Sequence, residues 1–162
     1  MDEQREIREQ VKQLLGSQKY GVLATSYEGQ PYTSLMAFAA TADLGRLVVV
    51  TDRETRKYAN LIADERVALL VDDRQNQVAD VRETLAVTAL GRAREATAEE
   101  RELLHQLFVS KHLELQEFLR SPFSALIAIA VERYSVVSRF RQVREFVPGL
   151  VTGGAGHCRP LP

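Results

Sequence analysis

Short apolar stretches separated by turns dominate the first half of the chain. Residues 20–27 and 31–40 carry apolar side chains in the alternating pattern that is typical of strands with one buried face. Gly29 between them predicts a tight turn in which glycine supplies the unusual backbone angle. Gly45 marks a second turn before the apolar stretch at 46–51. We therefore expect an antiparallel meander of three strands.

The second half of the chain continues this strand-rich pattern. Apolar or alternating stretches predict further strands at 67–71, 85–93, 125–131 and 134–140. Gly91, inside one of these stretches, predicts a β-bulge or a close approach by another group. About six strands at short intervals, with few long helices, favour a mainly β (α+β) fold: a small antiparallel β-barrel with peripheral helices.

Apolar residues at helical spacing predict the peripheral helices. The N-terminal helix covers 2–15, another covers 98–110, and a third helical stretch follows soon after it. A short helix is expected at 55–63, where Asp52 or Thr55 serves as the N-terminal cap. Its expected buried face consists of Tyr58, Leu61 and Ile62.

Composition places the chain among ordinary globular proteins. Apolar residues make up 45% and charged residues 27% of 162 residues, which suits one domain at 1–147, followed by a Gly/Pro-rich tail at 148–162. The net charge of −1 creates no overall field toward nucleic acid or membranes, so neither partner is expected. The charged start lacks an apolar signal core, and we expect a cytoplasmic protein.

Cysteine and histidine offer few candidates for a metal site. Cys158 is the single cysteine, which excludes an intrachain disulfide and a multi-cysteine site. His105 and His112 lie too far apart in sequence for the i, i+4 zinc pair, so no metal site is predicted. His157 beside Cys158 in the tail offers an alternative role, the ligation of haem or a soft metal.

The strongest candidate for chemistry is the turn after the strand at 46–51. It holds hydroxyl, acidic and basic side chains: Thr51, Asp52, Thr55, Arg56 and Lys57. Adjacent Arg and Lys at a helix N-terminus suit a phosphate, because free N–H groups and the helix dipole add to their charge. The alternative is a solvated surface turn, since the glycine-rich phosphate-binding motifs are absent.

The residues around this turn resemble the flavin-binding split-barrel family typified by pyridoxamine 5′-phosphate oxidase. A hairpin and a strand precede Thr51-Asp52-Arg53-Glu54-Thr55-Arg56-Lys57, and a helix with Asn60-Leu61 and the strand at 65–71 follow it. The resemblance covers roughly residues 5–145. It implies a six-stranded split β-barrel of Greek-key topology and a homodimer that binds FMN at the subunit interface.

The resemblance also implies roles for individual residues. Arg56 and Lys57 would bind the FMN phosphate with help from Thr51 and Thr55, while Asp52 and Asn60 would support the turn. The strand Ser34-Leu35-Met36-Ala37 would run along the flavin ring through its backbone groups. The remaining expected contacts are Val50 at the end of the preceding strand and Arg139 near the C-terminal end.

Two departures from the oxidases proper change the expected activity. The family's flavin-contacting Gln is absent from Leu85-Ala86-Val87-Thr88, and the chain does not end in the Arg-rich substrate segment. We therefore expect no vitamin B6 oxidation. The resemblance implies an FMN-dependent oxidoreductase acting on an unidentified small molecule. The alternative is a binding protein without turnover, and deazaflavin and haem are alternative cofactors because fold alone does not fix the ligand.

Overall fold

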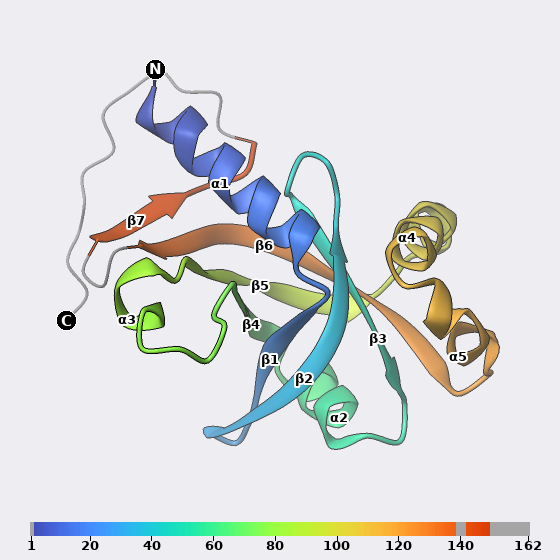
Figure 1. Ribbon diagram of the computed structural model, residues 1–162. Coiled ribbons are helices and arrows are strands. Elements are labelled where there is room, and N and C mark those ends of the chain that lie inside the picture. The colour runs from blue at the N-terminus through green and yellow to red at the C-terminus, as the bar shows by residue number, and fades with distance from the viewer. Residues whose placement is uncertain (1, 139–141, 150–162) are drawn as a thin grey trace.

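The chain folds into a β-barrel with helices on its outside (Figure 1). The computed structural model describes residues 2–138 and 142–149, and seven strands within them form one antiparallel sheet. The strands are β1 (Tyr20–Tyr27), β2 (Gln30–Ala40), β3 (Arg46–Asp52), β4 (Arg66–Asp72), β5 (Ala86–Glu95), β6 (Ser124–Ser138) and β7 (Gln142–Phe146). The helices are α1 (Glu3–Ser17), α2 (Arg56–Ala63), α3 (Asp80–Glu83), α4 (Ala98–Lys111) and α5 (Gln116–Arg120), with a 3-10 turn at Leu113–Leu115.

The predicted meander is confirmed. β1 and β2 pair along their length, and Glu28 and Gly29 both adopt positive φ angles of 49° and 80°. Such a two-residue turn matches the right-handed twist of the paired strands. β2 then pairs with β3, and β4 returns to lie beside β1, so the spatial order β3-β2-β1-β4 is a Greek key.

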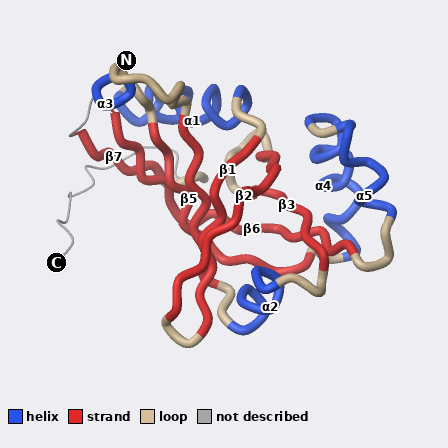
Figure 2. The backbone as a smooth tube through the Cα atoms, turned by 60° about the horizontal axis from the view of Figure 1, so that its bottom comes forward, coloured by secondary structure: helices blue, strands red, loops and turns tan. Residues whose placement is uncertain are grey.

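Pairing between β3 and β6 closes β1–β6 into a six-stranded barrel. The predicted fold class is therefore confirmed. Helices cover the two ends of the barrel, α1 at one end and α2 at the other (Figures 1 and 2). Four apolar residues of α1 are buried in the core of the barrel: Ile7, Val11, Leu14 and Leu15. On α2, Leu61 is buried in the same core.

The prediction of two separate strands at 125–131 and 134–140 is wrong. β6 is one continuous strand of 15 residues, and a register shift opposite Leu90 and Gly91 lets it bend without ending. Its first half pairs with β3 and its second half with β7, so one long strand serves two neighbours. β7 was not predicted, because it carries only two apolar residues, Val143 and Phe146, on either side of the adjacent charges Arg144 and Glu145.

Gly91 is the residue that permits this bend. A Cβ atom on Gly91 would lie 2.2 Å from the carbonyl oxygen of Ala130, a contact that no side chain tolerates. The predicted bulge and the predicted close approach are thus both present at the same residue. The glycine is required by packing against the neighbouring backbone.

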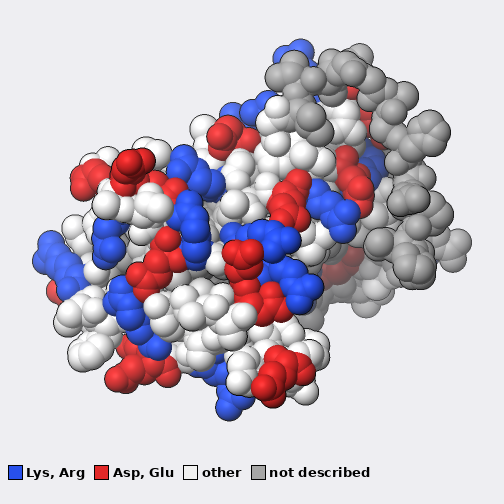
Figure 3. Space-filling model, turned by 180° about the vertical axis from the view of Figure 1, so that it is seen from behind, with Lys and Arg blue, Asp and Glu red and all other residues white. Residues whose placement is uncertain are grey.

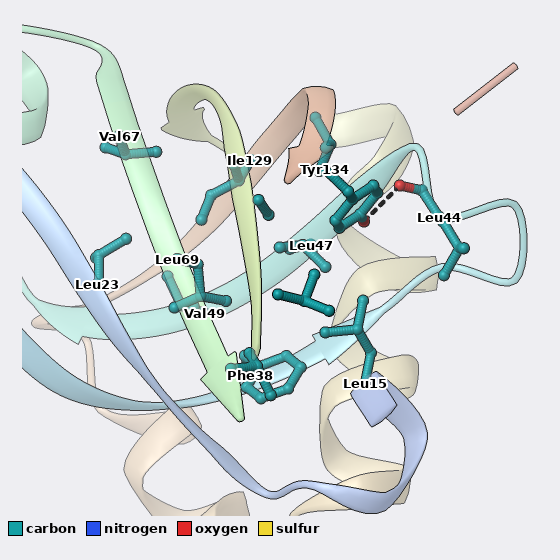
Figure 4. Close-up of a cluster of buried hydrophobic side chains, with 14 of the residues drawn as sticks. Leu15, Leu23, Phe38, Leu44, Leu47, Val49, Val67, Leu69, Ile129 and Tyr134 are labelled. Carbon is teal, nitrogen blue, oxygen red and sulfur yellow. Dashed lines mark hydrogen bonds between the residues drawn. The ribbon is translucent and has the colours of Figure 1, made fainter. Parts of the chain in front are cut away.

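Large aliphatic and aromatic side chains fill the barrel interior. Leu23, Phe38, Leu47, Leu69 and Ile129 converge from five different strands and are at most 1% exposed (Figure 4). Tyr134 brings a hydroxyl into this core, and its Oη donates a hydrogen bond to the carbonyl oxygen of Leu44 at 2.7 Å. Burial raises the pKa of Tyr134, so the phenol stays protonated as a donor.

A second apolar layer lies outside the barrel, where α4 covers β3 and β6. Leu104 and Phe108 of α4 are buried against a set of small and branched side chains: Ala39, Val48, Val50, Leu126 and Ala128. Arg94 and Arg46 both form ion pairs with Glu100 in the first turns of α4, which ties the helix to the barrel wall.

The surface carries charges of both signs. Lys and Arg side chains alternate with Asp and Glu over the face shown in Figure 3, and no broad region of one sign covers it. None of the described helices combines the length and the apolar character that a membrane span needs.

Candidate functional site

The predicted turn forms a tightly hydrogen-bonded start to α2. Thr55 is the N-cap, with its Oγ1 3.4 Å from the backbone N of Tyr58, and its hydroxyl donates to the carbonyl oxygen of Asp52 at 2.8 Å. The Asp52 carboxylate accepts a hydrogen bond from the backbone N–H of Glu54 at 2.8 Å. Both proposed capping residues therefore stabilise the turn, each at a different N–H group.

The side chain of Thr51, at the end of β3, supports this turn. Its hydroxyl lies 2.9 Å from that of Thr55, and the residue is only 2% exposed. Either hydroxyl can donate in this pair, and the Thr51 hydroxyl also lies 3.4 Å from the carbonyl oxygen of Asp52. The Thr51 side chain thus fixes the N-cap and does not reach the surface.

Arg56 and Lys57 follow the cap in the first turn of α2. Arg56 is exposed and Lys57 is partly exposed, and among the described residues neither forms a hydrogen bond or an ion pair through its side chain. Their charge adds to that of the helix N-terminus, where backbone N–H groups lack helical partners. The arrangement can bind an anion such as a phosphate.

The neighbouring cation, Arg53, is fully engaged. Its guanidinium forms a two-point ion pair with Glu95 of β5, at 2.9 and 3.2 Å, and Nη1 also donates to the carbonyl oxygens of Pro122 and Ser124. Tyr58 of α2 donates to the same carboxylate at 2.7 Å. Hydrogen bonds from Arg53 and then Tyr58 lower the pKa of Glu95, so the carboxylate stays charged. Sequence analysis missed this network, because nothing in the local pattern links residues 42 positions apart.

The base of α2 is also fixed to the hairpin. Asn60 is 4% exposed, and its Nδ2 donates to the hydroxyl of Thr25 in β1 at 3.1 Å. Ile62, which was expected to be buried, is instead 59% exposed. That prediction is wrong because the helix turns its polar Asn60 toward the buried hydroxyl of Thr25.

Residues 34–37 of β2, the segment expected to run along the flavin ring, are not paired with β3. β2 pairs with β3 over Phe38–Ala40, whereas residues 34–37 pair with β1 alone among the described strands. Alternate backbone N–H and C=O groups of residues 34–37 therefore face away from β1 without a strand partner. On β3, the residues after Val49 are likewise not paired with β2, and they lead through Val50 and Thr51 into the turn.

Side chains along this edge differ in their exposure. Met36 points into the barrel and is 6% exposed, while Leu35 on the other face is 74% exposed. Ser34 and Ala37 are partly buried, and Val50 is covered by the α4 layer. The edge thus presents backbone groups flanked by one large uncovered apolar side chain.

Most predicted site residues lie on β2, the end of β3 and the start of α2, and α2 contacts both strands. The side chains of Met36, Val50, Thr51 and Asn60 are buried, and Arg139 lies outside the described residues. A hollow of about 700 Å³ lies elsewhere, beside α3 and the loop between β4 and β5. The candidate site is defined by the cations Arg56 and Lys57, which have no ionic partner among the described residues, and by the strand edge at residues 34–37.

Comparison with known proteins places the fold in context. The sequence profile of the pyridoxamine 5′-phosphate oxidase family matches residues 7–138. A pyridoxamine 5′-phosphate oxidase homolog of Schizosaccharomyces pombe is 36% identical over 81 residues, which is 45% of this chain and 43% of that protein. The chain thus matches less than half the length of this relative.

Solved structures share the barrel at low sequence identity. A heme binding protein from Mycobacterium smegmatis superposes with a TM-score of 0.75 at 17% identity, covering 83% of this chain and 55% of the other. A FAD-binding protein from Mesorhizobium loti gives a TM-score of 0.63 at 20% identity, covering 78% and 91%. At sequence identities this low, the similarity shows a shared fold and nothing more.

Proposed function

Because the chain belongs to the pyridoxamine 5′-phosphate oxidase family, we propose that it binds FMN and uses it to oxidise or reduce a small molecule. The observation that carries the proposal is the pair Arg56 and Lys57, which lies at a helix N-terminus and has no carboxylate partner among the described residues. Arg53, three residues earlier, is neutralised by Glu95. The charge left over at this turn therefore suits a phosphate.

The strand edge fits the remainder of the cofactor. Free backbone donors and acceptors at residues 34–37 match the polar rim of a flavin ring, and the apolar side chain of Leu35 offers contact to an aromatic surface. When bound, the flavin supplies hydride or electron transfer, while the protein supplies position and electrostatics. This division of roles needs no acid or base from the chain.

We further propose that a second copy of the chain covers the site. Large apolar side chains are exposed around it: Leu35 on β2, Ile62 on α2 and Phe123, whose carbonyl oxygen accepts a hydrogen bond from the backbone N–H of Arg53. Exposed apolar residues grouped in this way are typical of protein interfaces. Sedimentation should give a homodimer, and Leu35→Asp should shift it toward the monomer; a monomeric wild type would contradict this part.

An FMN titration followed by flavin fluorescence tests the cofactor proposal. Replacing both cations with Arg56→Ala and Lys57→Ala should weaken FMN binding by about a hundredfold or more, because two charge-assisted contacts are lost. The matched control, Arg5→Ala with Arg8→Ala, removes the same charge from exposed positions on α1, at the other end of the barrel. Equal FMN affinity in all three proteins would sink the proposal.

The alternative function is flavin or haem binding without turnover, and the structural similarity to a heme binding protein from Mycobacterium smegmatis raises the haem version. His112 is a poor ligand for haem, because it is 0% exposed and its Nε2 lies 2.7 Å from the carbonyl oxygen of Phe38. The predicted pair His157 and Cys158 lies outside the described residues. Deleting residues 152–162 should lower haem affinity only if the haem version holds.

A further inference from the structure

A second, smaller hollow lies at the opposite end of the barrel from α2. It has a volume of about 240 Å³ and lies between α1, α4 and the turn that joins β2 to β3. Its wall is mainly apolar, with Leu15, Ala39, Leu44 and Leu107 among the contributors. Two cations, Lys12 and Lys111, line the same space, and no acidic residue does.

Lys111 is the unusual member of this set. Its Nζ donates to the carbonyl oxygen of Leu15 at 2.7 Å and lies 3.9 Å from the centre of the Phe38 ring. α1 has no basic residue in its own last turn, so Lys111 provides the cation that its C-terminus lacks. This contact uses one of three ammonium donors and leaves two for another acceptor.

The charge of Lys111 is not neutralised by the surrounding protein. Among the described residues it forms no ion pair, and burial alone lowers its pKa to about 8. Lys12 on α1 lines the same hollow, and the titratable residues that adjoin its lining residues in sequence include Asp43 in the turn and His112 after α4. Asp43 is already engaged by the hydroxyl of Thr41 at 2.6 Å and by the backbone N–H of Gly45.

An ammonium group in an apolar hollow without a counter-ion suits an amphipathic anion. We propose that this hollow is a binding site for a small aliphatic monocarboxylate, with its carboxylate on Lys111 and Lys12 and its chain against Leu15, Leu44 and Leu107. The site is separate from the proposed flavin site and goes beyond that function.

The volume limits the length of the ligand. A water molecule takes about 30 Å³ of liquid, so the hollow holds about eight groups of that size. Hexanoate, with six carbons and two oxygens, matches this limit and is the probe of choice. Its chain would cover the apolar wall while its carboxylate reaches the cations.

Isothermal titration of the whole protein with hexanoate at pH 7 tests the site. Saturable binding is expected, and Lys111→Met should weaken it about tenfold, because a hydrogen-bonded charge pair is lost. Binding of 1-hexanol, which keeps the chain but lacks the charge, should change little in the same variant. Hexanoate affinity should also fall as the pH rises above 8 and Lys111 loses its proton.

A second variant tests the site without removing Lys111, whose side chain caps the C-terminus of α1. Gly16 lines the hollow, and a Cβ atom there would meet nothing within 4 Å, so Gly16→Leu should fold and obstruct the space. FMN affinity at Arg56 and Lys57 should be unchanged in both variants, which separates this proposal from the first. The absence of saturable hexanoate binding, or equal affinity in wild type, Lys111→Met and Gly16→Leu, would overturn it.

Discussion

Arg53 and Glu95 hold the start of α2 against β5 through a two-point ion pair, with Nε–Oε1 at 2.9 Å and Nη2–Oε2 at 3.2 Å. The same guanidinium binds the carbonyl oxygens of Pro122 and Ser124, and Tyr58 binds the same carboxylate. One ion pair thus joins the turn, the helix, β5 and the beginning of β6. It therefore holds in place the start of α2, which carries Arg56 and Lys57.

The first prediction concerns this ion pair. Glu95→Gln should weaken FMN binding by a few-fold, less than the loss of Arg56 and Lys57 together, because it loosens the turn without removing a phosphate contact. The matched control is Glu65→Gln, which removes a carboxylate from a more exposed ion pair with Arg92. FMN titration of both variants checks this, and an effect as large as that of the double variant would contradict the positioning role.

Some residues of this site could be predicted from the sequence, and others could not. Arg56, Lys57 and the Thr55 cap could be found because adjacent residues in a turn share one location. The Arg53–Glu95 pair could not, since it depends on which strand lies beside the turn. Lys111 was missed for the same reason, because its partner Leu15 lies on another helix.

The barrel itself followed from alternation and turns, while the separation of β6 into two strands was wrong and β7 was not predicted. The two predicted strands at 125–131 and 134–140 left out Glu132 and Arg133, but both residues are exposed at the bulge and pairing continues through it. β7 forms because the second half of β6 offers an open edge, not because of its own composition. Such edges become visible only once the sheet is assembled.

The second prediction concerns Gly91. Gly91→Ala should lower the free energy of unfolding by about 2 kcal/mol or more, because the new Cβ atom would collide with the backbone of Ala130. Gly16→Ala is the control: its Cβ atom meets no neighbour, and alanine in a helix should raise stability by up to about 1 kcal/mol. Urea denaturation measures both, and equal effects would argue against the close approach.

The third prediction concerns the buried hydroxyl of Tyr134. Tyr134→Phe should lower the free energy of unfolding by about 1–3 kcal/mol, because the carbonyl oxygen of Leu44 loses its donor inside the core. Tyr27→Phe, at a 49% exposed position, should change stability very little. If the two variants unfold at the same urea concentration, the hydrogen bond contributes nothing.

The fourth prediction concerns stability in acid. The hydrogen bond from Arg94 lowers the pKa of Glu100 from its ordinary value of 4.5 to about 2. Because the pKa is lower in the folded state, the stabilisation is present above pH 4.5 and is lost as the pH falls toward 2. Glu100→Gln should therefore cost about 1 kcal/mol at pH 7, and the difference from wild type should vanish near pH 2.

Glu99→Gln is the control for this prediction, since it removes a charge from the preceding position in the helix without removing an ion pair among the described residues. Its stability should follow the wild type over the whole pH range. A Glu100→Gln variant whose deficit stays constant from pH 7 to pH 2 would show that the ion pair with Arg94 does not set the acid dependence.

An absorbance spectrum of the purified protein, recorded with added FMN if the protein is colourless, tests directly whether the protein binds FMN. Flavin bands and the release of FMN on denaturation are expected. A Soret band would contradict FMN binding and favour haem. A protein that stays colourless and binds no FMN would mean that Arg56 and Lys57 form an ordinary solvated turn.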